Sequence, residues 1–231
     1  MAAGLGARVF EDSPVIRVRH GERPLVETAS GSVRAGRVVL AGNAYLGGTE
    51  PRLEGRVVPA GSYIVATEPL SDTLSDRLLP TGVACCEYRV VPDYFRLSAD
   101  RRLLFGGLCT YSGREPPDID ASIRPRVRRV FPELGGVRID YRWGGHIAIS
   151  LNRIPQFGRI GGNTYYAQGY SGHGVAPAHL AGKLLADAIA GDAERFDVFA
   201  RIPHLRLPGG RRFANPVLAL GMLLYRLREL F

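Results

Sequence analysis

Residues 164–174 read Thr-Tyr-Tyr-Ala-Gln-Gly-Tyr-Ser-Gly-His-Gly and pass from a β-rich run, through a glycine-dense loop, toward a helical pattern. A turn of this kind points backbone N–H groups and the positive end of a helix dipole at whatever lies above it. Glycine at 169, 172 and 174 would let a flat or anionic ligand approach the backbone closely. A phosphate, a carboxylate or the anionic edge of a reduced ring would be satisfied there. A tight strand–helix turn without any ligand fits the same residues equally well.

The segments on either side of this loop follow regular patterns. A buried strand is predicted over 164–167, and a helix over 178–190 is expected to face inward with Leu180, Leu184, Leu185 and Ala188 and to end at Gly191. A basic amphipathic helix is predicted over 217–230. Short strands are predicted over 7–10, 15–18, 25–28 and 37–41. Residues 38–41 of the last of these form a continuous apolar run, which is typical of a strand buried on both faces.

The sequence pattern changes in the middle of the chain. A Gly/Thr/Pro stretch over 47–51 marks the predicted crossover from one domain to the next. We expect a strand over 63–67, a hairpin-like pair over 94–97 and 103–107, and a helix over 122–131 that Pro132 stops. Two further strands, over 137–143 and 146–150, are expected to be broken at Gly144-Gly145. Strands and helices mixed in this way predict an α/β or α+β fold.

The composition is that of an ordinary globular protein, with 45% hydrophobic and 23% charged residues. The formal net charge of +8 could favour nucleic acid, an anionic membrane or an acidic substrate. The basic residues are scattered, however, and their densest clusters are pairs such as Arg101-Arg102 and Arg128-Arg129. A nucleic-acid groove needs basic residues interleaved with aromatic ones, so we predict no nucleic-acid partner.

The cysteines at 85, 86 and 109 are too few and too irregular for a disulfide framework or a zinc site. We therefore expect reduced thiols, no metal and a cytoplasmic location. The chain does not open with the charged and apolar regions of a signal peptide. Its longest apolar run, over 217–225, is far shorter than the ~20 residues that a membrane span requires, so no span is expected.

Many motifs occur in one order along the chain. They are Val-Leu-Ala-Gly-Asn-Ala-Tyr-Leu over 39–46, Ala-Thr-Glu-Pro-Leu over 66–70, Asp-Tyr-Phe-Arg-Leu over 93–97, Leu-Phe-Gly-Gly over 104–107, Trp-Gly over 143–144, Arg-Ile-Pro-Gln-Phe-Gly over 153–158, Gln-Gly-Tyr-Ser-Gly-His-Gly over 168–174 and Ala-Gly-Lys over 181–183. Together they resemble the C-terminal half of the D-amino-acid-oxidase-like FAD-dependent oxidoreductases, and the resemblance covers nearly every residue. Glycine oxidase, sarcosine oxidase and D-amino-acid dehydrogenase belong to that family.

The resemblance implies the C-terminal portion of a two-domain FAD/NAD(P)-binding fold. Residues 1–48 and 151–200 would belong to the FAD-binding domain, 49–150 to a substrate domain with a mixed, largely antiparallel sheet, and 201–231 to a C-terminal extension and helix. The family opens with a strand, Gly-x-Gly-x-x-Gly and a helix that grip the ADP half of FAD. No such unit occurs here, because Gly4-Leu5-Gly6 follows no strand and has the wrong spacing. We therefore expect a fragment, half of a split enzyme or a pseudogene product, with low stability alone because the sheet would expose an apolar edge.

The resemblance also implies FAD as the cofactor. In the family the Ser-Gly-His-Gly loop lies beside the flavin ring, where its N–H groups and the helix dipole stabilise the anionic reduced flavin. The start of the crossover lies near the flavin as well. The cofactor-binding residues implied in this way are Asn43, Ala44, Gly169, Tyr170, Ser171, Gly172, His173 and Gly174.

The implied reaction is oxidation of an amine C–N bond: a hydride passes from the C–H beside the amine to the flavin, and the resulting imine hydrolyses. The substrate-binding residues implied are Tyr94, Arg96, Phe105 and Trp143, and no catalytic side chain is identified. Sarcosine oxidases place a lysine for the substrate carboxylate where this chain has Ala176. An amine derived from a polyamine, such as gamma-glutamylputrescine, is therefore favoured over a simple amino acid.

Plainer interpretations stay open beside these. His173 fits a loop residue better than a proton-transfer base, and Trp143 could belong to the core. Tyr165 and Tyr166 are interpreted as structural, because a strand turns successive side chains to opposite faces. The second functional class is non-catalytic: an inactive fragment, or a partner subunit for a separate N-terminal FAD-binding half.

Overall fold

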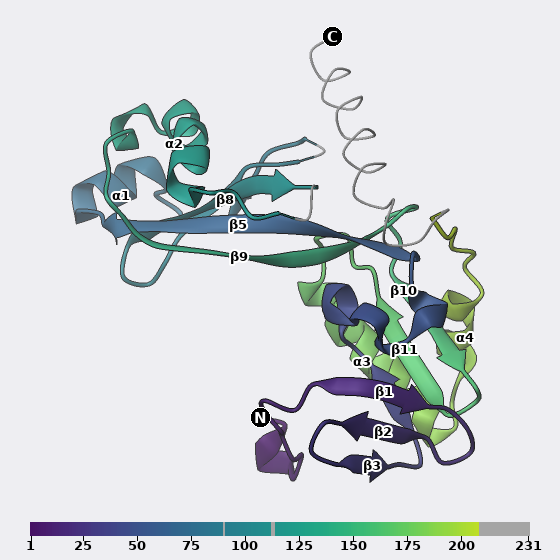
Figure 1. Cartoon of the computed structure of the whole chain (residues 1–231). Helices are drawn as coiled ribbons and strands as arrows, with labels where there is room; N and C mark the ends of the chain where they lie inside the picture. The colour runs from purple at the N-terminus through teal and green to yellow at the C-terminus, as the bar shows by residue number, and fades with distance from the viewer. Residues whose placement is uncertain (90, 112–113, 208–231) are drawn as a thin grey trace. The chain divides into compact units, whose positions relative to one another are not determined.

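The computed structural model describes residues 1–89, 91–111 and 114–207, which form two compact units (Figure 1). The first unit joins Met1–Val57 to the described chain from Ala148 onward, and the second contains the described residues of Val58–Ile147. The first unit is therefore built from two segments that are far apart in the sequence.

The first unit contains two small sheets. In one, β10 (Gln156–Ile160) is antiparallel to β11 (Thr164–Gln168), and β11 is parallel to β4 (Val38–Leu40). The other is an antiparallel meander of β1 (Val15–Arg19), β2 (Leu25–Thr28) and β3 (Ser32–Arg34). The helices α3 (Val175–Ala190) and α4 (Glu194–Ala200) complete the unit, with 3₁₀ turns at Ala3–Leu5, Asn43–Tyr45, Gly47–Thr49 and Pro51–Leu53.

Every residue of β11 is buried, which confirms the strand predicted over 164–167. Tyr165 packs with α3 and α4 on one face of the sheet, while Tyr166 packs with Leu40 on the other face. This confirms that the two tyrosines are structural and lie on opposite faces. Because β11 is held from both sides, the loop that follows it starts from a fixed position.

The second unit is a five-stranded sheet in the order β6-β7-β8-β5-β9. Its strands are β5 (Val57–Pro69), β6 (Cys85–Cys86), β7 (Tyr94–Leu97), β8 (Arg102–Thr110) and β9 (Ile139–Ser150). The helices α1 (Asp72–Leu78) and α2 (Ile119–Val130) and a 3₁₀ turn at Pro132–Leu134 accompany the sheet. Strands β7 and β8 pair antiparallel, as the hairpin-like pattern predicted. The fold is thus mixed α and β with mostly antiparallel pairing, as predicted.

The ends of the helices follow from local chemistry. The carboxylate of Asp118 accepts a hydrogen bond from the Ala121 N–H at 3.0 Å, so α2 begins earlier than the predicted residue 122. Gly191 ends α3 with φ of 113°, a left-handed conformation that glycine adopts readily. Ile123 and Val127 of α2 pack into the core of the second unit beside Phe105.

Two predicted strands need correction. Residues 7–10 form no strand, because this exposed segment pairs with no other strand among the described residues. The strands predicted over 137–143 and 146–150 are one continuous strand, β9. A Cβ atom on Gly144 would lie 2.2 Å from the Tyr63 ring, so this glycine makes room for a side chain rather than breaking the strand.

Two burial predictions are also wrong. Leu180 was expected to face inward but is 41% exposed, because α3 packs through Ala181, Leu184 and Leu185. Val39 is likewise 41% exposed, so β4 is not buried on both faces. The helix predicted over 217–230 lies outside the described residues. Within the described residues, no helix is long and apolar enough to cross a membrane.

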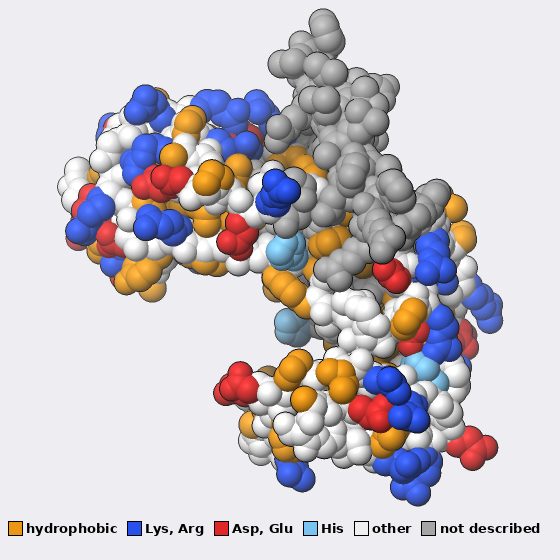
Figure 2. Space-filling view, viewed as in Figure 1, with side chains coloured by type: hydrophobic (Ala, Val, Ile, Leu, Met, Phe, Trp, Pro, Cys, Tyr) orange, Lys and Arg blue, Asp and Glu red, His pale blue; other side chains and the backbone are white. Residues whose placement is uncertain are grey.

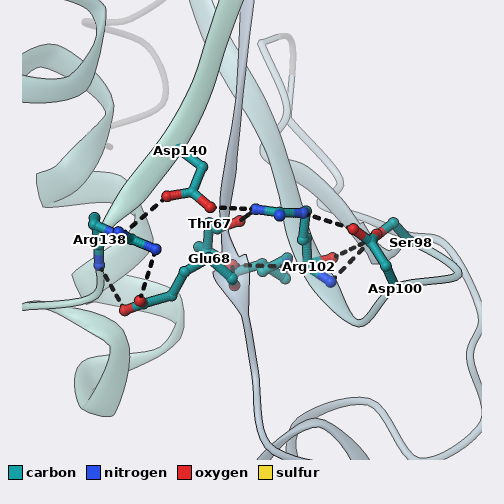
Figure 3. A network of polar contacts seen from close by, with 8 residues as sticks. Thr67, Glu68, Ser98, Asp100, Arg102, Arg138 and Asp140 are labelled. Carbon is teal, nitrogen blue, oxygen red and sulfur yellow. Dashed lines mark hydrogen bonds and ion pairs between the residues drawn. The ribbon is translucent and has the colours of Figure 1, made fainter.

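Much of the arginine excess takes part in ion pairs. In the second unit, the Arg102 guanidinium contacts carboxylates of Asp100 at 2.7 Å and Asp140 at 2.5 Å, and it donates to the Thr67 carbonyl at 2.8 Å (Figure 3). Arg138 adds ion pairs to Asp140 at 3.0 Å and to Glu68. The contacts of Arg102 and Arg138 connect β5, β8 and β9 at one end of the sheet. On the face drawn in Figure 2, basic side chains are scattered among acidic and apolar ones.

Candidate functional site

The loop after β11 turns through left-handed backbone conformations. The φ angles are 76° at Gly169, 54° at Ser171 and 92° at Gly172. Glycine adopts such angles without strain, whereas serine does so at a cost. The Ser171 N–H donates to the Ala148 carbonyl at 2.9 Å, and this hydrogen bond helps to hold the strained residue in place.

The Ser171 side chain is turned into the protein. Its hydroxyl donates to the Gly169 carbonyl at 3.2 Å and accepts from the Ser150 N–H at 3.3 Å, and the residue is 5% exposed. The His173 N–H donates to the Tyr170 carbonyl at 3.0 Å. Two N–H groups that were expected to be available to a ligand therefore have acceptors within the protein: that of Ser171 bonds to β9, and that of His173 bonds within the loop.

The N–H groups left for a ligand lie slightly further along the chain. Gly172 is exposed, and its N–H has no acceptor within the described part of the chain. The helix α3 begins after Gly174 without a side-chain cap, and Val175 and Ala176 of its first turn are exposed. Unpaired backbone N–H groups at an uncapped helix start suit an anion.

Asn43 connects the crossover segment to this loop. Its side-chain oxygen accepts a hydrogen bond from the Gly169 N–H at 2.9 Å. The residue has φ of 48°, and asparagine tolerates this left-handed conformation better than most residues. Ala44 follows it in the 3₁₀ turn and is half-buried. The structure therefore brings together the two sequence regions from which cofactor-binding residues were predicted.

A buried pair of amides supports the loop from below. The Gln168 side chain donates to the Gln156 side chain at 3.1 Å, and Gln156 donates to the Arg56 carbonyl at 2.8 Å. Burial raises the pKa of the nearby Tyr170 hydroxyl. Sequence reasoning missed Ser150 and Gln156, because a buried polar residue gains its role from a partner that is distant in sequence.

Tyr94 of β7 lies on the second unit's sheet, with its ring over Gly106 of β8. A Cβ atom on Gly106 would lie 2.3 Å from the ring. The Tyr94 hydroxyl is 3.4 Å from the Ser62 hydroxyl. Burial raises the pKa of Tyr94; the Ser62 hydrogen bond opposes this shift, and the Cys109 and Cys86 thiols add to it. Ser62, Cys86 and Cys109 thus join Tyr94 at this position, although sequence reasoning did not select them.

The other predicted substrate-binding residues occupy different places. Because strand side chains alternate, Arg96 lies on the same face of β7 as Tyr94. Arg96 is exposed. Phe105 lies on the opposite face: it is fully buried and stacks on Phe95 with 5.7 Å between the ring centroids. Trp143 of β9 is 44% exposed. The structure therefore brings Tyr94 and Arg96 to one face but places Phe105 in the core.

A buried carboxylate holds the start of β7. Asp93 has no exposed surface and accepts hydrogen bonds from Arg126 at 2.6 Å and Arg129 at 2.5 Å, both on α2. Its Oδ1 atom also lies where a Cβ on Gly107 would come within 2.3 Å. Asp93 therefore fixes the chain immediately before Tyr94 against both α2 and β8.

The hydrogen-bond donors of this loop suit the ring of a flavin cofactor. A motif for the pyrophosphate of the cofactor is not found in the sequence. The uncapped start of α3 and the exposed Gly172 N–H suit the anionic edge of a reduced ring. The 231 residues contain no strand–Gly-x-Gly-x-x-Gly–helix unit for a dinucleotide pyrophosphate. Among the described residues, no group of three or more His, Cys, Asp or Glu side chains could hold a metal ion.

Comparison with known proteins shows the family of this chain. A family model described as "DAO: FAD dependent oxidoreductase" matches residues 1–188. Gamma-glutamylputrescine oxidoreductase from Escherichia coli is 47% identical over 225 residues, which cover 97% of this chain and 53% of that protein. The chain spans about half the length of the relatives it matches.

Solved structures share the fold. Glycine oxidase from Geobacillus kaustophilus superposes with a TM-score of 0.65 at 21% identity, over 82% of this chain and 51% of that one. L-proline dehydrogenase from P. horikoshii gives a TM-score of 0.67 at 21% identity, over 85% and 57% of the respective chains. At this level of identity the likeness concerns the fold alone.

Proposed function

Because the chain belongs to the DAO family of FAD-dependent oxidoreductases, we propose that it supplies the flavin-ring and substrate sides of an enzyme that oxidises an amine C–N bond. The observation that carries this proposal is the loop after β11. It presents the exposed Gly172 N–H and the uncapped start of α3 side by side. These donors suit a ring that becomes anionic when it is reduced.

The chain's own residues would position and stabilise rather than react. When bound, FAD would accept a hydride from the C–H beside the substrate nitrogen, and the imine so formed would hydrolyse. The N–H groups of Gly172 and of the first turn of α3 would hold the anionic edge of the ring. Asn43 would keep the loop in that position through its hydrogen bond to Gly169. No side-chain nucleophile is required.

We propose gamma-glutamylputrescine or a related amine as the substrate. The 47% identical relative carries that substrate in its name. Ala176 in the first turn of α3 is exposed and offers no cation for an amino-acid carboxylate. Tyr94 and Arg96, which share one face of β7, would contact the substrate, with Arg96 holding an anionic end of the molecule.

In this proposal the first unit is the FAD-binding part and the second unit the substrate-binding part. No disulfide links Cys85, Cys86 and Cys109, and we propose a reducing compartment such as the cytoplasm. The ADP half of FAD would be held by a polypeptide that carries Gly-x-Gly-x-x-Gly, as a partner of these residues.

A visible absorption spectrum after incubation with excess FAD and desalting tests the proposal. The chain is measured alone and with the part of the E. coli relative that this chain does not match. Retained flavin that bleaches on addition of gamma-glutamylputrescine is the expected result for the mixture. Retained flavin that bleaches only with other amines would refute the substrate assignment. A mixture that forms a complex but retains no flavin would refute the catalytic proposal.

A second candidate function is that of a non-catalytic subunit, because the exposed donors of the loop suit the flavin ring alone. Such a chain would bind and stabilise a separate FAD-binding half without contributing to turnover. Replacing Asn43 by Ala distinguishes the two, because it loosens the loop without touching the second unit. An unchanged rate of flavin bleaching in the variant complex would favour the non-catalytic role.

A further inference from the structure

The last described residues form a segment that crosses two other parts of the first unit. We call residues 203–207, which follow α4 and end the coloured chain in Figure 1, the strap. The Leu207 N–H donates to the Gly55 carbonyl at 2.9 Å, and the Arg206 guanidinium donates to the Glu54 carbonyl at 2.8 Å. Leu207 is buried. These contacts hold the strap against the chain immediately before β5.

His204 connects the strap to the loop after β9. The Asn152 side chain donates from Nδ2 to the Pro203 carbonyl at 3.2 Å. Its Oδ1 atom accepts from the Ile154 N–H at 3.2 Å and lies 3.2 Å from His204 Nδ1. Because Oδ1 can only accept, His204 Nδ1 must carry the proton of this hydrogen bond. In the neutral ring, Nε2 therefore carries a lone pair and no proton.

The Nε2 atom of His204 is buried and has no hydrogen-bond partner in the part of the chain that the structure describes. Protonation would place an N–H donor and a positive charge at this atom. A buried donor without an acceptor loses its hydration and gains no hydrogen bond in exchange. Burial, followed by the charge of Arg56, lowers the pKa of His204 below the ordinary 6.5. The docked strap thus favours the neutral ring.

The charged side chains on the segments that His204 joins do not offset a positive ring. They are Glu54 and Arg56 before β5, Arg153 in the loop after β9, and Arg201 and Arg206 after α4. Glu54 is exposed, and it meets Arg206 through its backbone carbonyl. A protonated His204 would therefore lie among segments that carry more cations than carboxylates.

The loop that the strap holds also supports the glycine loop after β11. The Ser150 hydroxyl donates to the Ile154 carbonyl at 2.8 Å, and the Ser150 N–H donates to the Ser171 hydroxyl at 3.3 Å. Asn152, which contacts His204, accepts from the N–H of the same Ile154. A series of hydrogen bonds therefore connects the strap to Ser171 of the glycine loop.

From these contacts we propose that the strap is a pH-sensitive device: it docks while His204 is neutral, and protonation of His204 releases it and loosens the loop after β9. In the released strap, Nε2 reaches water and accepts a proton without loss of hydration. The released state therefore binds one proton more than the docked state. Docking weakens by up to tenfold for each pH unit below about 6.5, and this loss ends at the pKa of the docked His204.

Amide hydrogen exchange of the full 231-residue chain, measured by NMR without FAD between about pH 7.5 and 5, tests the device. The protection factor of the Leu207 N–H, corrected for the intrinsic exchange rate, should be nearly constant above about pH 6.5 and fall by up to tenfold per pH unit below it. The Tyr165 N–H in the buried strand β11 is the internal control and should keep its protection throughout. A Leu207 protection factor that does not change with pH would overturn the proposal.

His204→Asn is the matched variant, because its amide can donate to Asn152 as Nδ1 does but cannot titrate. Leu207 protection in this variant should vary by less than about twofold over the same pH range. If the variant keeps the pH dependence of the unaltered chain, another group is responsible and the proposal is wrong.

Titration of the His204 ring by NMR checks the cause directly. Its pKa should lie below 6.5, and Asn152→Ala, which removes the anchor of the strap, should raise it toward that value. A pKa at or above 6.5 in the unaltered chain would contradict the inference. The Ser150 N–H should lose protection together with the Leu207 N–H, and constant Ser150 protection would refute the link to the glycine loop. These measurements need no flavin, so their failure would leave the proposed function untouched.

Discussion

Replacing Asn43 by Ala should loosen the loop that follows β11. The substitution removes the acceptor of the Gly169 N–H, now bonded at 2.9 Å, and Gly169 is buried. A buried N–H left without a partner costs about 1–3 kcal/mol. Asn43 also has φ of 48°, where alanine is less favourable by about 1 kcal/mol. We therefore expect the loop to be destabilised by about 2–4 kcal/mol.

Amide hydrogen exchange measured by NMR reports on this loop directly. Since about 1.4 kcal/mol corresponds to a factor of ten, the Gly169 N–H should exchange roughly 30- to 700-fold faster in the variant. The Phe105 N–H, in the second unit, serves as the internal control and should keep its rate. Asn43→Gly should lose the same hydrogen bond but relieve the left-handed strain, so its effect should be smaller by about 1 kcal/mol. A Gly169 rate within threefold of the unaltered chain would refute the reasoning.

Other changes test further contacts. Burial alone would raise the pKa of Glu50, but hydrogen bonds, led by those from Arg52, hold this pKa below the ordinary 4.5. The ionised Glu50 therefore contributes its full stabilisation above about pH 4.5, and this contribution is lost as the pH falls through the folded-state pKa. Glu50→Gln should therefore flatten the acid side of the plot of thermal midpoint against pH, and an unchanged slope would contradict this. Asp93→Asn should lower the free energy of urea unfolding of the second unit by about 3 kcal/mol, because two guanidinium groups lose a fully buried anionic partner. An unshifted unfolding midpoint would show that the ion pairs are dispensable. Gly106→Ala should displace the Tyr94 ring and cost about 1–3 kcal/mol, and unchanged near-ultraviolet circular dichroism would count against the close contact.

The elements that local pattern predicts well are those whose sequence signals lie within a few residues of one another. Strand β11, the pairing of β7 with β8 and the end of α3 at Gly191 all depend on short-range signals. Strand β9 was predicted as two pieces because glycine usually interrupts a strand. The reason for Gly144, which is space for the Tyr63 ring, lies on a strand about 80 residues away.

The candidate site divides in the same way. The glycine loop, Asn43 and Tyr94 were selected from motifs, and the structure places Asn43 in contact with the loop. Phe105 was selected with them, although it faces the core, because a motif does not report which face of a strand its residues occupy. Ser150, Gln156 and Ser62 carried no local signal.

The sequence alone determined the family and the glycine loop, because both depend on the order of residues along the chain. Only the tertiary structure decided which N–H groups of that loop remain available. The N–H groups of Ser171 and His173 donate to the carbonyls of Ala148 and Tyr170, whereas the Gly172 N–H has no acceptor among the described residues. The physical reason is that a backbone N–H is satisfied by whatever acceptor the folded chain places within about 3 Å of it.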